Sequence, residues 1–130
     1  MTDRELLEEA KKAMGHAYAP YSRFKVGAAL LGEDGRVFTG CNVENASFGA
    51  AICAERNAMT TAVSQGCTRI VKIAVASSGG GRTYPCGICR QFLSEFADRE
   101  SVIVLEDADG GVMRLPFGEA YPYPFDRDSL

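Results

Sequence analysis

Three cysteines and one glutamate stand at spacings that suit a catalytic metal site. Cys53-Ala54-Glu55 supplies one thiol and a carboxylate, and Pro85-Cys86-Gly87-Ile88-Cys89 supplies two more thiols. Three protein ligands leave one position of a tetrahedral zinc ion open for water, whereas a structural zinc site normally has four. A carboxylate beside that water can move protons to and from it. The motifs therefore predict catalytic zinc, with Glu55 as the proton carrier.

Both motifs are predicted to stand where a loop or strand gives way to a helix. Unpaired N–H groups at a helix N-terminus carry partial positive charge, which stabilises thiolates. The i, i+3 spacing of Cys86 and Cys89 puts both sulfurs on one side of the first turn. Three thiolates exceed the charge of Zn²⁺ by one, so a neighbouring cation is expected. We favour Arg56 as a hydrogen-bond donor to sulfur, and expect Arg90 to form a surface ion pair.

Composition excludes several classes of protein. The 130 residues are 46% hydrophobic and 24% charged, which predicts one soluble domain spanning residues 1–130. A net charge of −3 without a basic block argues against a nucleic-acid partner. No apolar run is long enough for a membrane span. Five cysteines without an export signal indicate reduced thiols and a cytoplasmic location.

The order of predicted elements indicates an α/β fold. A first helix begins at Thr2 with a capping-box pattern and is expected to end at Pro20. Helices alternate with apolar strands after it, which implies a central sheet covered on both faces. Proline and aromatic residues alternate over 121–125, and we expect these aromatic side chains to reach another surface. The remaining predicted elements are strands 25–31, 36–41, 70–77, 102–106 and 112–115, and helices 53–65 and 86–97.

Four segments carry a family pattern: 17–30, 40–47, the pair formed by 53–55 and 85–89, and 86–91. In this order they resemble the zinc-dependent cytidine deaminases of the small-subunit type. A lone Cys-x-x-Cys would be weak support, but these segments span nearly the whole chain. The resemblance implies a three-layer α-β-α sandwich with a mixed five-stranded sheet, and a homotetramer whose active sites are shared between subunits.

The resemblance also assigns roles to individual residues. Cys53, Cys86 and Cys89 would hold zinc, and an activated water would attack C4 of cytosine. Glu55 would take a proton from that water and return it to ring N3 and to the leaving amine. The products would be uridine or deoxyuridine and ammonia, a step of pyrimidine salvage.

Substrate contacts are implied for five more positions. The backbone at Ala54 would bind the base, and Phe24 would pack against the substrate. Asn42 and Glu44 would bind the ribose hydroxyls, because an amide and a carboxylate together can donate to and accept from a diol. Phe125 would enter the site of a neighbouring subunit.

Three departures from the family pattern bear on the pocket rim and the subunit contacts. Tyr84 stands before Pro85 where a small residue is common, Ala50-Ala51-Ile52 is less polar than usual, and Ala120-Tyr121-Pro122 replaces a more usual Leu-Leu-Pro.

Each assignment has a plainer alternative. Phe24 could be a core residue, Asn42 and Glu44 could be turn residues, and Phe125 could belong to a disordered tail. For the whole protein, the alternatives are a thiol redox protein that uses Cys86 and Cys89, a zinc-stabilised binding module, and a deaminase of aminoglycosyl cytosine antibiotics.

Overall fold

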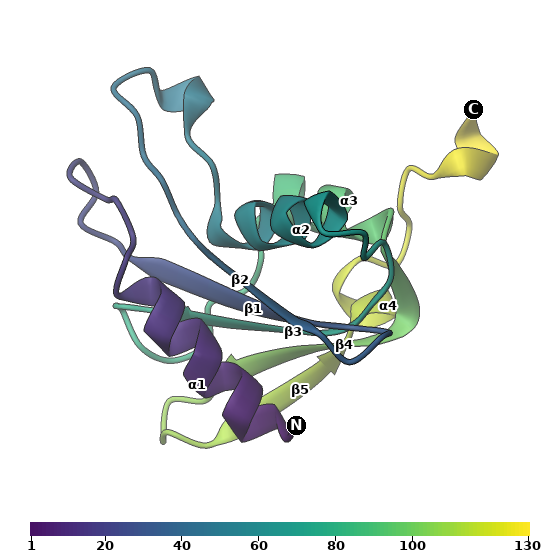
Figure 1. The fold of residues 1–130 in the computed structure, drawn as a ribbon, viewed down its shortest axis with the longest axis horizontal. Helices are drawn as coiled ribbons and strands as arrows, with labels where there is room; N and C mark the ends of the chain where they lie inside the picture. The colour runs from purple at the N-terminus through teal and green to yellow at the C-terminus, as the bar shows by residue number, and fades with distance from the viewer.

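A mixed five-stranded sheet lies at the centre of the protein in the computed structural model, which describes residues 1–130 (Figure 1). The strands lie in the order β2-β1-β3-β4-β5. All neighbouring pairs are antiparallel except β3 and β4, which are parallel. The strands are β1 (Val26–Gly32), β2 (Val37–Cys41), β3 (Ile70–Ser77), β4 (Ala97–Glu106) and β5 (Val112–Pro116).

Helices cover both faces of the sheet, so the expected three-layer sandwich is confirmed (Figure 1). On one face, Leu6 and Leu7 of α1 pack against small side chains of the central strands, including Ala29 and Ala74. On the other face, α2, α3 and α4 bury a larger cluster that includes Met59. The helices are α1 (Asp3–Met14), α2 (Ala54–Ser64), α3 (Gly87–Ser94) and α4 (Phe117–Ala120), with short 3₁₀ turns η1 (Phe48–Ala50) and η2 (Arg127–Ser129).

Two glycines let the helices approach the sheet closely. A Cβ atom on Gly27 of β1 would lie 2.0 Å from the Ala10 carbonyl oxygen of α1. A Cβ atom on Gly40 of β2 would lie 2.5 Å from the Ala58 nitrogen of α2. Neither separation leaves room for a side chain, so glycine is required at both contacts. The second contact fixes how the N-terminal half of α2 sits on the sheet.

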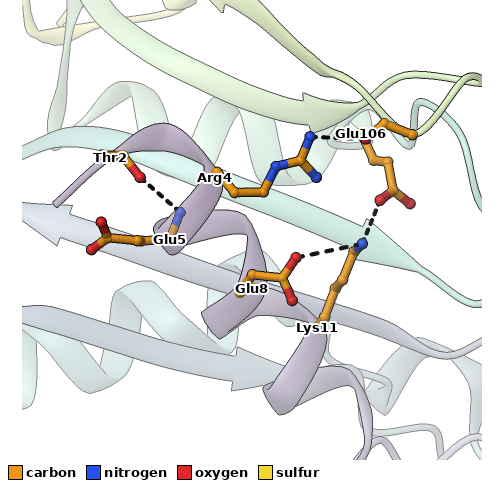
Figure 2. Close-up of polar contacts among 7 residues, drawn as sticks. Thr2, Arg4, Glu5, Glu8, Lys11 and Glu106 are labelled. Atoms are coloured by element: carbon orange, nitrogen blue, oxygen red, sulfur yellow. Dashed lines mark hydrogen bonds and ion pairs between the residues drawn. The ribbon is translucent and has the colours of Figure 1, made fainter.

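Polar contacts tie α1 to the hairpin of β4 and β5 (Figure 2). Thr2 Oγ1 accepts a hydrogen bond from the Glu5 N–H at 3.1 Å and so caps the helix. Lys11 forms an ion pair with Glu106 of β4, and Arg4 Nη2 donates to the Gly110 carbonyl at 2.9 Å. These contacts stabilise the face of the sheet opposite to α2 and α3.

Three predicted boundaries are wrong: the ends of two helices and the start of β4. The first helix ends at Met14 rather than at Pro20. The Gly15 N–H donates to the Lys12 carbonyl and the His16 N–H donates to the Ala13 carbonyl, and the chain then turns. The third helix ends at Ser94 rather than at 97. Ala97 instead opens β4, where it pairs with Ile70 of β3. The pairing with β3 therefore overrides the helical pattern, and β4 starts five residues before the predicted strand.

The other predicted strands and the helix over 53–65 are confirmed to within one or two residues. The short helix α4 was not predicted, because four residues are too few for a periodic pattern. None of the helices has the length and apolar character that a bilayer crossing requires.

Candidate active site

Three thiols meet where the N-termini of α2 and α3 come together. Cys53 is the N-cap residue of α2, Cys86 is the N-cap residue of α3, and Cys89 lies in the first turn of α3. The Cys53 and Cys86 sulfurs are 3.9 Å apart, and all three sulfurs lie within 4.8 Å of one another. The two motifs, whose cysteines Cys53 and Cys86 are 33 positions apart in the sequence, thus form one cluster.

The cluster has the dimensions of a zinc site. Two thiolates bound to tetrahedral zinc at about 2.3 Å are about 3.8 Å apart. The Cys53 and Cys86 sulfurs are close to this separation, and the third sulfur lies within 4.8 Å of both. No fourth cysteine, histidine or carboxylate belongs to the cluster. Thiolate ligands suit zinc, and a site with three protein ligands is open to a further one.

The Cys53 and Cys89 thiols differ in acidity. A hydrogen bond with Cys89, and then contacts with Arg56 and Cys86, lower the pKa of Cys53 to about 5, although burial acts in the opposite direction. The same contact with Cys53, together with burial, raises the pKa of Cys89 above its usual range. Cys53 is therefore more acidic than Cys89, and a cation that binds both sulfurs must displace the Cys89 proton.

Glu55 lies in the first turn of α2 and is almost fully buried beside the thiols, with 4% of its surface exposed. Burial raises the pKa of its carboxyl group from 4.5 to about 7, and the Cys53 charge acts in the same direction. Its own backbone N–H and the Arg56 charge oppose this shift. A carboxyl group with a pKa near neutrality can both accept and donate a proton at physiological pH.

Of the two arginines after the motifs, only Arg56 contacts the cluster. Arg56 Nη2 lies 3.7 Å from the Cys53 sulfur, and this hydrogen bond raises the arginine pKa. Arg90 Nη1 instead donates to the Ala120 carbonyl at 3.0 Å. The surface ion pair expected for Arg90 does not form, because the carbonyl at the last residue of α4 lies within reach of this side chain instead.

A pocket of about 310 Å³ opens above the thiols and Glu55. It brings together most of the predicted site residues, from the sheet, from both helices and from the loops between them. Cys89 lies behind it, buried in α3. The lining residues are Ser22, Phe24, Val26, Asn42, Glu44, Cys53, Ala54, Glu55, Thr83, Tyr84 and Cys86.

Asn42 and Glu44 shape the wall of this pocket through contacts with the backbone. The Asn42 amide accepts from the Val26 N–H at 2.9 Å and donates to the Phe24 carbonyl at 2.8 Å. The Glu44 carboxylate accepts from the Ser22 hydroxyl and from the backbone N–H groups of Ser22 and Tyr21, and these bonds lower the pKa of Glu44. Both residues therefore hold the segment that carries Phe24, and both also face the pocket.

Phe24 follows a strained residue. Arg23 has a φ of 60°, in the left-handed region of backbone conformation that residues other than glycine rarely adopt. The Phe24 N–H donates to Ser22 Oγ at 3.0 Å, which closes the turn. A Cβ atom on Gly79 would lie 3.1 Å from the Phe24 ring, so the ring packs closely against the loop after β3. Phe24 is 43% exposed, which shows that it is a rim residue and not a core residue.

Phe125 does not line the pocket of its own chain. Gln91 Nε2 of α3 donates to the Phe125 carbonyl at 2.8 Å, and Arg127 pairs with Glu95 beyond it. The tail leaves the body of the protein past α4 (Figure 1). The Phe125 side chain is 59% exposed. Tyr121 packs against the core of its own chain, contrary to the expectation for the tail aromatics.

Four of the pocket residues were not named as site residues from the sequence. Ser22 lies in the loop between α1 and β1, and Val26 is the first residue of β1. Thr83 and Tyr84 lie in the loop between β3 and α3. The signals present in the sequence were that Ser22 and Val26 belong to segment 17–30, which resembles the family, and that Tyr84 departs from the family pattern at the pocket rim.

Replacement of Cys86 by Ala should remove bound zinc, because two thiols cannot hold the ion as three do. The Tm should fall as well, since metal binding is coupled to folding. Cys41→Ala is the matched control, because Cys41 is a half-buried cysteine outside the cluster. Metal analysis and thermal denaturation of both variants test this, and an unchanged zinc content in the Cys86 variant would rule out the ligand set.

Replacement of Glu55 by Gln should change how stability depends on pH in the metal-free protein. Below pH 4.5 the carboxyl group is protonated in both the folded and the unfolded chain and contributes nothing to the pH dependence. Between pH 4.5 and about 7 only the unfolded chain ionises, so the wild type loses stability as pH rises, by about 3 kcal/mol in total. Urea unfolding of both proteins from pH 4 to 8 measures this. Parallel curves would show that Glu55 is not the titrating group.

Comparison with known proteins gives a consistent assignment. Residues 1–105 match the family model described as the cytidine and deoxycytidylate deaminase zinc-binding region. The chain is 39% identical over 130 residues to cytidine deaminase of Sporosarcina psychrophila, covering 100% of this chain and 96% of that protein. It is 41% identical over 129 residues to cytidine deaminase of Halalkalibacterium halodurans, covering 98% of each.

Solved structures agree with these sequence matches. The crystal structure of cytidine deaminase from Burkholderia pseudomallei superposes with a TM-score of 0.89 at 46% identity, covering 96% of this chain and all of that chain. Cytidine deaminase from Mycobacterium tuberculosis gives a TM-score of 0.85 at 38% identity, covering 97% of this chain and 98% of that chain. A zinc-compatible thiol cluster, a buried carboxyl group and full-length matches thus place this chain in the zinc-dependent cytidine and deoxycytidylate deaminase family.

Proposed function

We propose that this protein, as a single domain over residues 1–130, deaminates cytidine and deoxycytidine to uridine and deoxyuridine with release of ammonia. The observation that carries this proposal is the buried Glu55 carboxyl group beside three convergent thiols, at the base of a pocket. Relatives that match nearly the full length of the chain bear the name cytidine deaminase, which supports this choice of substrate.

Different residues of the site have different roles in the proposed hydrolysis. Zinc held by Cys53, Cys86 and Cys89 supplies the activation of water at neutral pH. Glu55 accepts a proton from the attacking water and delivers it to ring N3. It then accepts the remaining proton of the oxygen now bound to C4 and delivers it to the amine, which leaves as ammonia while C4 becomes a carbonyl carbon. The raised pKa of Glu55 suits both directions of transfer. The Arg56 contact with Cys53 draws negative charge from the sulfur, which limits the excess charge of the cluster.

The pocket suits a nucleoside. Ala54 presents its backbone and Phe24 its ring to the base, while Asn42 and Glu44 lie at the end assigned to the sugar. One N–H of the Asn42 amide is committed to Phe24, which leaves the other for a hydroxyl group. The Glu44 carboxylate has further lone pairs beside those used by the turn.

The charges of the pocket favour a nucleoside over a nucleotide. No Lys or Arg side chain is among the lining residues, and Glu44 contributes a negative charge. A phosphate group would therefore be desolvated without a compensating cation. Together with the acidic balance of the chain, this argues against a polynucleotide substrate.

We also assign this protein a homotetrameric state in which the tail of one subunit completes the site of another. The support is geometric: Phe125 is held away from its own pocket with its ring exposed. Large apolar side chains around the site are exposed as well, including Phe48, Ile52 and Ile88. Apolar side chains gathered in this way are typical of a surface that another protein covers.

The decisive experiment is turnover of cytidine by the zinc-loaded protein, followed by the ultraviolet change on conversion to uridine, with Glu55→Ala as the test variant. We expect the wild type to convert cytidine, and the variant to keep its zinc while losing at least about a hundredfold in kcat. Substantial turnover by the variant would refute the role of Glu55. A zinc-stabilised binding module predicts no turnover by either protein, and a thiol redox protein predicts disulfide cycling by Cys86 and Cys89 instead.

Removal of the tail aromatic tests the shared site. Phe125→Ala should raise KM for cytidine, because the side chain would no longer close the pocket of a neighbouring subunit. Leu130→Ala is the matched control, since Leu130 is an exposed apolar residue of the same tail. Steady-state kinetics and sedimentation of both variants would separate a loss of substrate contact from a loss of assembly. Kinetics identical to those of the wild type would remove Phe125 from the site.

A further inference from the structure

Tyr84 forms a wall of the active-site pocket at its thiol end. It lies two residues before Cys86, and both residues line the pocket together with Thr83. About half of the Tyr84 surface is exposed, at 49%, so the ring stands at the edge of the cavity and is not packed in the core.

The ring is held from outside the pocket. Arg82 Nη1 donates to the Tyr84 hydroxyl group at 3.5 Å, and Arg82 Nε pairs with Asp107 Oδ1 at 2.8 Å. Asp107 follows β4 directly, and its N–H bonds the Gly111 carbonyl across the turn before β5. The pair with Asp107, and then the contact with Tyr84, raise the pKa of Arg82, while Arg82 lowers the pKa of Asp107. A charged contact therefore links Tyr84 to the end of a central strand.

The loop that carries Tyr84 is fixed at both ends. The Ser77 and Thr83 hydroxyl groups are hydrogen-bonded across its base, and Cys86 begins α3. Gly80 and Gly81 have φ values of 69° and 66°, so the chain turns sharply there and returns toward the pocket. Conformational freedom is thus confined to the glycine turn, and the wall itself is held in place.

The position of this wall selects one part of the substrate. If the protein is a cytidine deaminase, as proposed above, the reacting C4 atom must lie beside Glu55 and the thiols. The sugar then points toward Asn42 and Glu44. A wall next to Cys86 faces the edge of the base that carries the amine, which comprises N4 and the neighbouring C5 atom.

We propose that Tyr84, positioned by Arg82 and Asp107, determines specificity by limiting the size of substituents at N4 and C5 of the cytosine ring. The ring of Tyr84 leaves space for an unsubstituted amine and C–H edge and excludes an added methyl group. Differences of one methyl group in an apolar pocket change kcat/KM by about 10- to 200-fold.

The test measures kcat/KM of the zinc-loaded protein for cytidine, 5-methylcytidine and N4-methylcytidine, in the wild type and in Tyr84→Ala. We expect the methylated-to-unmethylated ratio to rise by about tenfold or more in the variant for at least one of the two analogues. Tyr18→Ala is the matched control, because Tyr18 is similarly exposed but does not line the pocket. A ratio within about twofold of wild type for both analogues would overturn the proposal.

Arg82→Gln provides a second variant that keeps the ring but removes the cation that holds it. It should raise the same ratio by a smaller factor, and a ratio equal to wild type would show that Arg82 does not position the ring. A ratio of two substrates is insensitive to a general loss of active protein, so partial unfolding of a variant does not mimic the effect. A wild type that converts no cytidine would instead refute the proposed function itself.

Discussion

The structure depends on bringing two helix N-termini together around three sulfur atoms. Thiols bind a metal ion as thiolates, and the helix ends and Arg56 supply positive potential beside these sulfurs. The meeting requires the parallel pair β3 and β4, whose connection places α3 beside α2, and it requires glycine at position 40 so that α2 can lie close to β2. The fold thus serves to hold two short motifs at ligand distance.

Burial raises the pKa of Glu55 toward neutrality, which suits proton transfer but lowers the stability of the fold. A carboxyl group surrounded by apolar atoms and thiols resists ionisation, which moves its pKa toward neutrality. The same resistance weakens the fold at neutral pH, because the unfolded chain ionises freely. A bound cation changes both effects, since it neutralises the thiolates that oppose a second negative charge. Metal, proton transfer and folding are therefore linked through one small cluster.

Two polar residues of the pocket both stabilise the neighbouring backbone and present atoms that a ligand could bind. Asn42 and Glu44 each bond to the backbone of the turn that carries Phe24, yet both face the cavity. The hydrogen bonds to the backbone restrict the orientation of each side chain, so the atoms that face the cavity are held in a defined position. On the opposite side, the contact of Arg82 with Asp107 has the same effect on Tyr84. The pocket is thereby preorganised by contacts that lie mostly outside it.

The local pattern of the sequence was sufficient to predict the cysteine ligands, Glu55 and the alternation of helices and strands, because these depend on residue type and on spacing within one or two turns. Resemblance to a family added Phe24, Asn42 and Glu44, which carry no local signature of their own. Tertiary structure alone decided the end of α3 and the early start of β4, because pairing with β3 outweighs helical periodicity. It also decided the partner of Arg90, the place of Tyr84 in the pocket wall and the separation of Phe125 from its own site. Each of these depends on segments distant in sequence that only the packed sheet and helices bring into contact.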